Sequence, residues 1–202
     1  MPVKIALVGA GHMGRIHLGK LVNMADVDII GVIDSDPSMR DLVAATYGVP
    51  CFPDTENLPG HPDGVIIATP TDTHHHYGDL FLRQGTHVFC EKPLASSPEE
   101  AEHLVSEAKE RGLTLQVGHL ERFNPAFAQG LGLIERPLLI EAHRMSSFTG
   151  RSVDIDVVFD LMIHDLDLVL SLAGSPVREI RGQGLPFLID KLDAATVRLA
   201  FE

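Results

Sequence analysis

The first 34 residues constrain the fold most, because they combine a strand, a glycine-rich turn, a helix and a second strand in one order. An apolar run at residues 3–8 leads directly into Gly9–Gly14, which reads Gly-Ala-Gly-His-Met-Gly, and an amphipathic helix pattern follows. A second apolar run at residues 27–33 ends on Asp34, 20 positions beyond the last glycine. This spacing predicts a dinucleotide-binding βαβ unit.

Each part of this unit has a physical task. Gly9 permits the tight turn, Gly11 lets the backbone approach a pyrophosphate, and Gly14 lets the helix pack on the strand. The helix N-terminus offers unpaired N–H groups to phosphate. The Asp34 carboxylate accepts hydrogen bonds from an adenosine ribose and disfavours a 2′-phosphate, so we expect NAD rather than NADP. Arg40, the nearest cation, is expected to soften that preference.

Composition argues against several classes of protein. With 45% hydrophobic residues the chain can bury a core, and its net charge of −12 disfavours a nucleic-acid or anionic-membrane surface. Cys51 and Cys90 form no disulfide framework and no metal-type spacing. The adjacent histidines at 74–76 point in different directions on a helix, so we expect no metal site. Without a signal-peptide pattern or a membrane-spanning apolar run, we expect a cytoplasmic protein.

Strand and helix signals alternate from residue 1 to about residue 118, which predicts an α/β fold with a parallel, doubly wound sheet. After Asp34, helices are expected at residues 37–46, 72–84 and 97–111, and strands at 64–68, 86–90 and 113–118. The third helix has the clearest start, Ser97-Pro98-Glu99-Glu100, with a capping serine, a proline and two acids. We assign residues 1–119 to an NAD-binding Rossmann domain.

The pattern changes near residue 120 to that of an α+β domain. Helices are expected at residues 124–134 and 157–173, strands at 138–148, 177–184 and 194–201, and a mobile loop at 149–152. Few helices lie between these strands, which is typical of the α+β class. We assign residues 120–202 to a partial substrate and oligomerisation domain.

Reactive side chains follow several of the expected strands, where ligands of open α/β sheets bind. Thr69-Pro70 and His74 come after one strand, and Glu91-Lys92 after the next. Glu91-Lys92 is either a solvated pair or places a lysine beside nicotinamide. Asp160 and His164, spaced i, i+4, form either a surface pair or a histidine general base with its carboxylate. Residues 119–125 serve either interdomain packing or substrate binding.

The order of these motifs narrows the alternatives. G-x-G-x-x-G, Thr-Pro-x-x-x-His, Glu-Lys-Pro, Val-Gly-x-x-x-Arg-Phe and Asp-x-x-x-His together resemble the glucose–fructose oxidoreductase/inositol dehydrogenase/MocA family over essentially the whole chain. The resemblance implies that Lys92, Asp160 and His164 are catalytic and that the Lys92–Pro93 peptide is cis. It implies cofactor contacts from Gly9, Gly11, His12, Met13, Gly14, Asp34, Thr69, Pro70, His74, Glu91 and Lys92, and substrate contacts from His119, Arg122 and Asn124.

The resemblance also implies a reaction. A sugar or cyclitol hydroxyl loses its proton to His164 and its hydride to nicotinamide, while Lys92 stabilises the developing oxyanion and Asp160 orients the pair. Within the family, residues 117–125 look most like nucleotide-sugar 3-dehydrogenases acting on UDP-N-acetylglucosamine-type substrates. The alternatives are an inositol or polyol dehydrogenase, a reductase of an imine or linear tetrapyrrole, and a non-catalytic NAD-binding sensor. An intact Lys92, Asp160 and His164 favours an enzyme.

One departure from the family concerns length. Family members are usually much longer, with a large, mostly antiparallel second-domain sheet, whereas this chain ends at Glu202 after at most three strands of it. We therefore expect a truncated α+β domain, either in a fragment or in a genuinely shorter protein. Because the strand at 194–201 would leave an unpaired edge, we expect homo-oligomers through the second-domain sheet.

Overall fold

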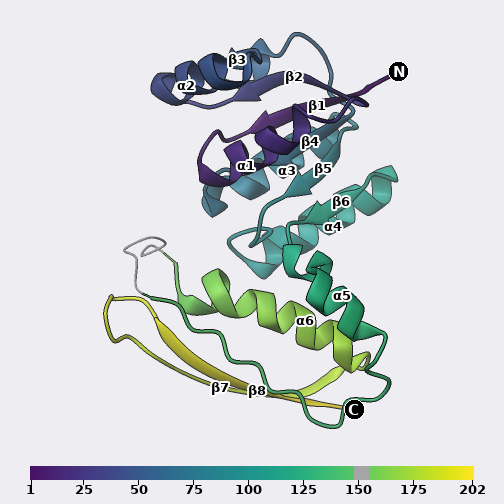
Figure 1. Cartoon of the computed structure of the whole chain (residues 1–202), viewed down its shortest axis with the longest axis vertical. Helices are drawn as coiled ribbons and strands as arrows, with labels where there is room; N and C mark the ends of the chain where they lie inside the picture. Colours follow the sequence, from purple (N-terminus) through teal and green to yellow (C-terminus); the bar gives the residue numbers. More distant parts are fainter. Residues whose placement is uncertain (148–154) are drawn as a thin grey trace. The chain divides into compact units, whose positions relative to one another are not determined.

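A computed structural model of the chain describes residues 1–147 and 155–202. The chain divides into two compact units, Met1–Gly118 and His119–Glu202, and each is described by itself (Figure 1). The loop expected at residues 149–152 lies outside the described residues.

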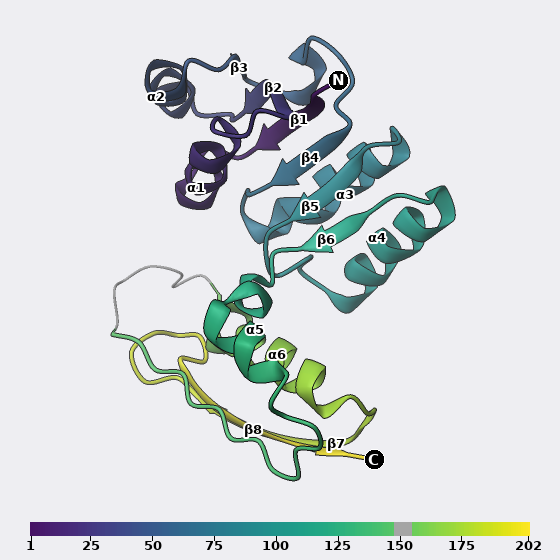
Figure 2. The ribbon, with the colours of Figure 1, turned by 45° about the vertical axis from the view of Figure 1, so that its right-hand side comes forward.

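The first unit is built on a six-stranded parallel sheet with the order β3-β2-β1-β4-β5-β6 (Figure 2). The strands are β1 (Val3–Val8), β2 (Val27–Ile33), β3 (Cys51–Phe52), β4 (Gly64–Ile67), β5 (His87–Cys90) and β6 (Leu115–Val117). The chain builds outwards from β1 to β3 and then from β4 to β6, so the order reverses between β1 and β4. Ligands of such sheets bind at the carboxyl ends of the strands beside this switch point.

Helices cover both faces of this sheet. They are α1 (His12–Leu21), α2 (Pro37–Tyr47), α3 (His74–Arg83) and α4 (Pro98–Arg111). Leu18 of α1 and Val43 of α2 pack in one buried cluster with Leu7 of β1. Phe81 of α3 and Leu104 of α4 pack in another cluster, which includes Val8, the neighbour of Leu7. Since adjacent strand residues face opposite sides, the predicted doubly wound sheet is confirmed.

Local signals account for the helix ends. The Ser97 hydroxyl accepts a hydrogen bond from the Glu100 N–H at 3.2 Å, and α4 ends at Gly112 with a φ of +65°. The predicted start and end of this helix are thus confirmed. The helix expected from residue 72 instead begins with a 3₁₀ turn, Thr71–Thr73, and α3 follows from His74. The Thr73 hydroxyl closes that turn by donating to the Pro70 carbonyl at 2.8 Å.

The second unit contains α5 (Pro125–Leu131), α6 (Ile163–Ala173) and the two strands β7 (Val177–Leu185) and β8 (Ala194–Phe201). The two strands pair antiparallel, which confirms the expected pairing of the last two strands. Along β8, Thr196 and Arg198 are exposed, while Ala195, Val197, Leu199 and Phe201 on the opposite face are half-buried. One face of this strand is therefore covered within the unit (Figure 1).

Two expectations for the second unit were wrong in detail. Residues 138–147, the described part of a predicted strand, form no strand, because no ladder hydrogen bond joins them to a partner among the described residues. The helix expected from residue 157 opens with a π-helical turn, Val158–Met162, before α6 begins. The carboxylate of Asp156 caps that turn, accepting from the N–H groups of Val158 and Phe159 at 3.0 and 3.1 Å.

The two units differ in how deeply they bury apolar side chains. Every fully buried residue in the described ranges belongs to the first unit. In the second unit Ile180, Leu185 and Phe187 are 67%, 58% and 72% exposed. None of the helices in the described part of the chain is long and apolar enough to cross a membrane.

Candidate active site

The glycine-rich loop after β1 is shaped by contacts that only glycine permits. Gly9 has a φ of +93°, and a Cβ added there would lie 2.6 Å from the Ala68 carbonyl oxygen. A Cβ on Gly14 would lie 1.9 Å from the Gly9 carbonyl oxygen, so this glycine lets α1 pack against the loop. A Cβ on Gly11 would meet nothing within 4 Å. Gly11 therefore faces open space, as a close approach by a pyrophosphate requires.

The first turn of α1 is open to an anion. Gly11 is the N-cap residue and supplies no side-chain cap, so the first N–H groups of the helix keep their donor capacity. His12 and Met13 open the helix, and their N–H groups point out of its N-terminal end. These residues fit the diphosphate of a dinucleotide.

Asp34 lies at the end of β2, beside the loop. Its Oδ2 accepts from the Ala10 N–H at 2.7 Å and its Oδ1 from the Asp36 N–H at 2.9 Å. Each carboxylate oxygen has a second lone pair for a ribose hydroxyl. Arg40 donates to the carbonyls of Asp34 and Ser35 at 2.7 and 2.9 Å, so its guanidinium is held close to the same place.

His74 is deeply buried. It is only 1% exposed, and its two ring nitrogens lie 2.8 Å from the carbonyl oxygens of Thr69 and Pro93. The ring therefore joins the segment after β4 to the segment after β5. Both of its ring nitrogens contact protein groups.

Glu91 follows β5 and is also buried. Its Oε1 lies 2.6 Å from His17 Nε2 on α1, and the residue is 7% exposed. A Cβ on Gly118 would lie 2.7 Å from Glu91 Oε2, so this glycine makes room for the carboxylate. Sequence reasoning missed His17. Its place three residues after Gly14, on the same helical face, was the available signal.

Lys92 lies between the two buried histidine contacts. Glu91 precedes it, and Pro93, whose carbonyl contacts His74, follows it. The Lys92–Pro93 peptide is cis, which confirms that prediction.

Cys90, the last residue of β5, is only 1% exposed. Burial, with the nearby Glu91 charge, raises the pKa of its thiol to about 12. We expect Cys90 to resist alkylation in the folded protein at pH 8 and to react after denaturation, since the thiolate is the reactive form. Mass spectrometry of iodoacetamide-treated protein tests this. Rapid labelling in the folded state would contradict it.

The same raised pKa predicts a pH effect on stability. The folded state holds the thiol proton more tightly than the unfolded chain. The group therefore stabilises the fold below its ordinary pKa of 9.0, and this contribution falls as pH rises towards about 12. Denaturant unfolding measures this effect: as pH rises above 9, Cys90→Val should lose less stability than the unaltered chain does. Cys51→Ser, at the half-buried cysteine, should alter the pH dependence of stability less than Cys90→Val does.

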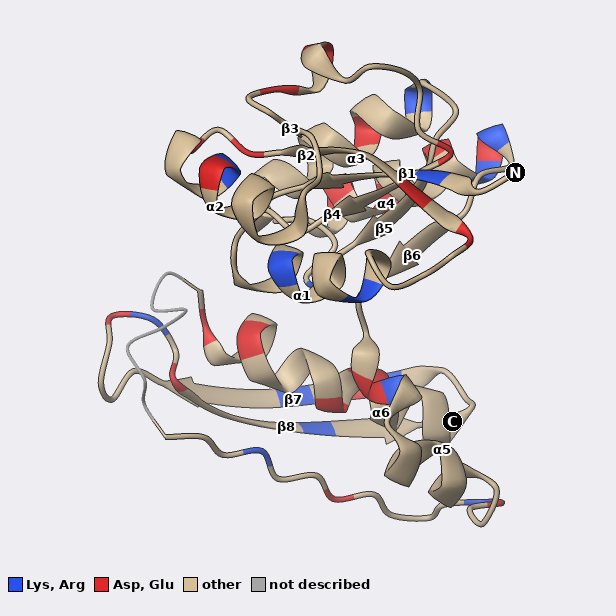
Figure 3. Cartoon of the chain, turned by 45° about the horizontal axis from the view of Figure 1, so that its top comes forward, with Lys and Arg blue, Asp and Glu red and all other residues tan. Residues whose placement is uncertain are grey.

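The second unit carries Asp160 in the π-helical turn and His164 in α6. The i, i+4 relation assumed a regular α-helix, and the π turn changes that phase between the two residues. Figure 3 shows acidic positions at several points along α6. Two of them are paired: Arg122 binds Asp167 through two nitrogens at 2.7 and 2.6 Å, and Arg144 binds Asp165 at 2.9 Å. These pairs raise the pKa of both guanidinium groups.

The three predicted substrate residues begin the second unit. Arg122 uses two donors on Asp167. Asn124 caps α5 by accepting from the Ala126 N–H at 3.0 Å. The buried Nδ1 of His119 has no hydrogen-bond partner among the described residues. His119 is thus the one of the three with a buried polar atom that a ligand would satisfy.

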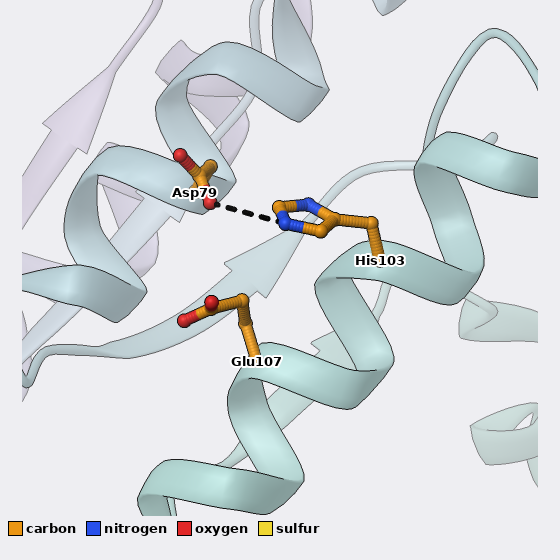
Figure 4. A group of neighbouring side chains, drawn as sticks. All are labelled: Asp79, His103 and Glu107. Carbon is orange, nitrogen blue, oxygen red and sulfur yellow. Dashed lines mark ion pairs between the residues drawn. The ribbon is translucent and has the colours of Figure 1, made fainter.

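A separate group on α3 and α4 has the residue types of a metal site. Figure 4 shows Asp79, His103 and Glu107 facing one another, with His103 Nε2 3.7 Å from Asp79 Oδ1. Arg83 binds Asp79 at 2.8 Å and Arg111 binds Glu107 at 2.6 Å. The arginine pairs lower the pKa of Glu107 and raise that of Arg83. An ion pair within each helix therefore accounts for the two carboxylates of this group.

Comparison with known proteins identifies relatives of the chain. Residues 3–119 match the family model described as an oxidoreductase family with an NAD-binding Rossmann fold. The chain is 38% identical over 198 residues to the UDP-N-acetylglucosamine 3-dehydrogenase of Acidithiobacillus ferrooxidans, covering 96% of this chain and 62% of that protein. It is 34% identical over 191 residues to an inositol 2-dehydrogenase of Acidothermus cellulolyticus, covering 89% and 56%.

A solved structure shows the same architecture. The UDP-N-acetylglucosamine 3-dehydrogenase GnnA from Acidithiobacillus ferrooxidans superimposes with a TM-score of 0.93 at 36% sequence identity, covering 100% of this chain and 66% of that one. The chain thus spans less than two thirds of the length of these relatives.

Proposed function

Because the chain belongs to this glucose–fructose oxidoreductase/inositol dehydrogenase/MocA family of oxidoreductases with an NAD-binding Rossmann fold, we propose that it oxidises a secondary hydroxyl of a sugar with NAD. The proposed substrate is a nucleotide sugar such as UDP-N-acetylglucosamine, which is oxidised at C3. The observation that carries the proposal is the open glycine-rich loop at the switch point of the sheet, next to strand ends that bear Asp34 and Lys92. The 38% identity to a UDP-N-acetylglucosamine 3-dehydrogenase supports the substrate.

The residues of the first unit fit NAD. Gly11 leaves space for the diphosphate, the first turn of α1 donates N–H groups to it, and Asp34 accepts from the adenosine ribose. When bound, NAD supplies the hydride acceptor. In this proposal Thr69, Pro70 and Glu91 shape the wall of the cofactor site.

Three side chains carry the proposed chemistry. Lys92 donates a hydrogen bond to the reacting oxygen and stabilises negative charge as it develops there. His164 takes the hydroxyl proton, a role suited to imidazole at neutral pH. Asp160 orients His164. The pairs Arg122–Asp167 and Arg144–Asp165 hold α6, the helix from which His164 projects.

We predict that the chain binds NAD more tightly than NADP. Both Asp34 oxygens already accept backbone N–H groups, so the carboxylate is fixed where a 2′-phosphate would lie and repels it. Calorimetric titration with both oxidised cofactors should show a preference of at least about tenfold, or about 1.4 kcal/mol. Asp34→Ser should narrow this difference, and Asp36→Ser is the matched control. Equal or tighter binding of NADP would contradict the assignment.

We predict that UDP-N-acetylglucosamine raises the unfolding temperature more than inositol does. A ligand that binds only the folded state stabilises it by mass action, by about 2.7 kcal/mol at 100 times Kd. Thermal unfolding with NAD present, and with each ligand at equal concentration, measures this. UMP serves as a control for uridine binding alone.

The second candidate function is an inositol or polyol dehydrogenase. The 34% identity to an inositol 2-dehydrogenase favours it. A clear thermal response to inositol, with none to UDP-sugars, would establish this candidate in place of the first. Binding of NAD without turnover of any sugar or cyclitol would instead point to a sensor.

The proposed enzyme self-associates through the sheet of its second unit. The exposed apolar side chains of β7 and of the segment after it, Ile180, Leu185 and Phe187, support this arrangement. Light scattering tests the prediction.

A further inference from the structure

We propose that His17 and His74 are positioning residues that brace Lys92 from both sides and so set the rate of the chemical step. The inference rests on the proposed catalytic role of Lys92. His17 holds the side chain of Glu91, the residue before Lys92, and His74 holds the carbonyl of Pro93, the residue after it.

The contact before Lys92 is a largely buried contact between a histidine ring and a carboxylate. His17 Nε2 lies 2.6 Å from Glu91 Oε1, and the two side chains are only 15% and 9% exposed. The His17 ring also meets Phe89 of β5 edge to face, with ring centroids 5.2 Å apart. Removing one partner of a buried pair leaves an uncompensated group, so the other partner must move or recruit water. His17 thus restrains the start of the lysine-bearing segment.

The contact after Lys92 uses backbone groups. His74 Nδ1 lies 2.8 Å from the Pro93 carbonyl, and Nε2 lies 2.8 Å from the Thr69 carbonyl. A neutral imidazole donates through one nitrogen only, so the ring bonds one of these carbonyls and lies in close contact with the other. His74 thus ties the segment that bears Lys92 to the segment after β4.

The two histidines come from opposite faces of the sheet. His17 is on α1, the helix whose N-terminus fits the cofactor diphosphate, and His74 begins α3 on the other face. Backbone bonds anchor the strand end between them: the Glu91 N–H donates to the Ile67 carbonyl at 2.9 Å, and the Gly118 N–H donates to the Cys90 carbonyl at 2.8 Å. The brace therefore fixes Lys92 relative to α1, the helix proposed to bind the cofactor diphosphate.

Substitutions that remove or keep a donor test the brace. His17→Leu and His74→Leu remove the contacts, whereas His17→Gln and His74→Gln keep an N–H donor. His76→Gln is the matched control, because His76 lies exposed on α3, two residues after His74. We expect each Leu variant to lower kcat per NAD-binding site at least about tenfold, since misplacement by about 1 Å costs up to about 100-fold. The Gln variants should recover most of that loss.

Two readouts separate positioning from a general loss of stability. Substrate deuterated at the reacting carbon should show a larger isotope effect on kcat in the Leu variants, because hydride transfer becomes rate-limiting. Fewer folded molecules would lower the number of NAD-binding sites and leave the isotope effect unchanged. Amide hydrogen exchange followed by mass spectrometry should show faster exchange at residues 89–95 in the Leu variants and not in His76→Gln.

These readouts also separate the brace from the proposed function. If the unaltered chain oxidises none of the sugars, the proposed function fails, and exchange at residues 89–95 alone decides whether the brace exists. If exchange and kcat per site in both Leu variants match those of His76→Gln, the brace is overturned.

Discussion

Replacing Lys92 with Met is expected to abolish turnover while NAD binding stays close to that of the unaltered chain. Lys92 follows β5, whereas the proposed phosphate and ribose contacts belong to the loop after β1 and to Asp34. Removing one donor that stabilises a developing oxyanion lowers kcat by about 10²–10³-fold. Methionine keeps the length of the lysine side chain and removes its charge. NADH absorbance with the best sugar measures turnover, and calorimetry measures the Kd of NAD.

Lys109→Met is the matched control for this experiment. Lys109 lies exposed near the end of α4, so its replacement removes one positive charge away from the proposed site. A Lys92→Met protein that turned over at the rate of the Lys109→Met protein would remove Lys92 from the mechanism. Loss of turnover together with loss of NAD binding would mean that Lys92 serves cofactor binding instead. The two measurements thus assign the residue to chemistry or to binding.

The parts of the fold that sequence predicts well depend on neighbours in the chain. Ser97 and Gly112 define the two ends of α4 through contacts within one turn of the helix. The same holds for Gly14, which packs against the carbonyl of Gly9 in the same loop, although Gly9 itself is constrained by Ala68 in a distant segment. A single sequence is sufficient to predict such features because the interacting residues lie within a few positions of each other.

The features that sequence missed depend on distant partners. His17 and Glu91 are 74 positions apart, so no local pattern reveals that they form a buried pair. Residues 138–147 have an apolar pattern that suits a strand, yet strand formation requires a neighbour to complete the ladder. The π-helical turn before α6 is a different case: its cap at Asp156 is local, but apolar periodicity does not distinguish a π-helical turn from an α-helical one.

Gly14→Ala and Gly11→Ala are expected to act on different properties of the same loop. A Cβ at position 14 would lie 1.9 Å from the Gly9 carbonyl oxygen, so the loop or α1 must shift. Such overpacking costs about 1–3 kcal/mol and sometimes more. A Cβ at position 11 would meet nothing within 4 Å, so the unliganded protein should keep its stability within about 0.5 kcal/mol.

Although Gly11→Ala should leave the stability of the unliganded protein unchanged, it should impair cofactor binding. Its Cβ would stand in the space that the diphosphate requires, so Gly11→Ala should weaken NAD binding at least about tenfold, or about 1.4 kcal/mol. Denaturant unfolding without cofactor and calorimetry with NAD measure the two effects separately. Gly19→Ala on α1 is the control, because a Cβ there would make only ordinary contacts with Tyr47. Tight NAD binding by Gly11→Ala would show that the diphosphate lies elsewhere.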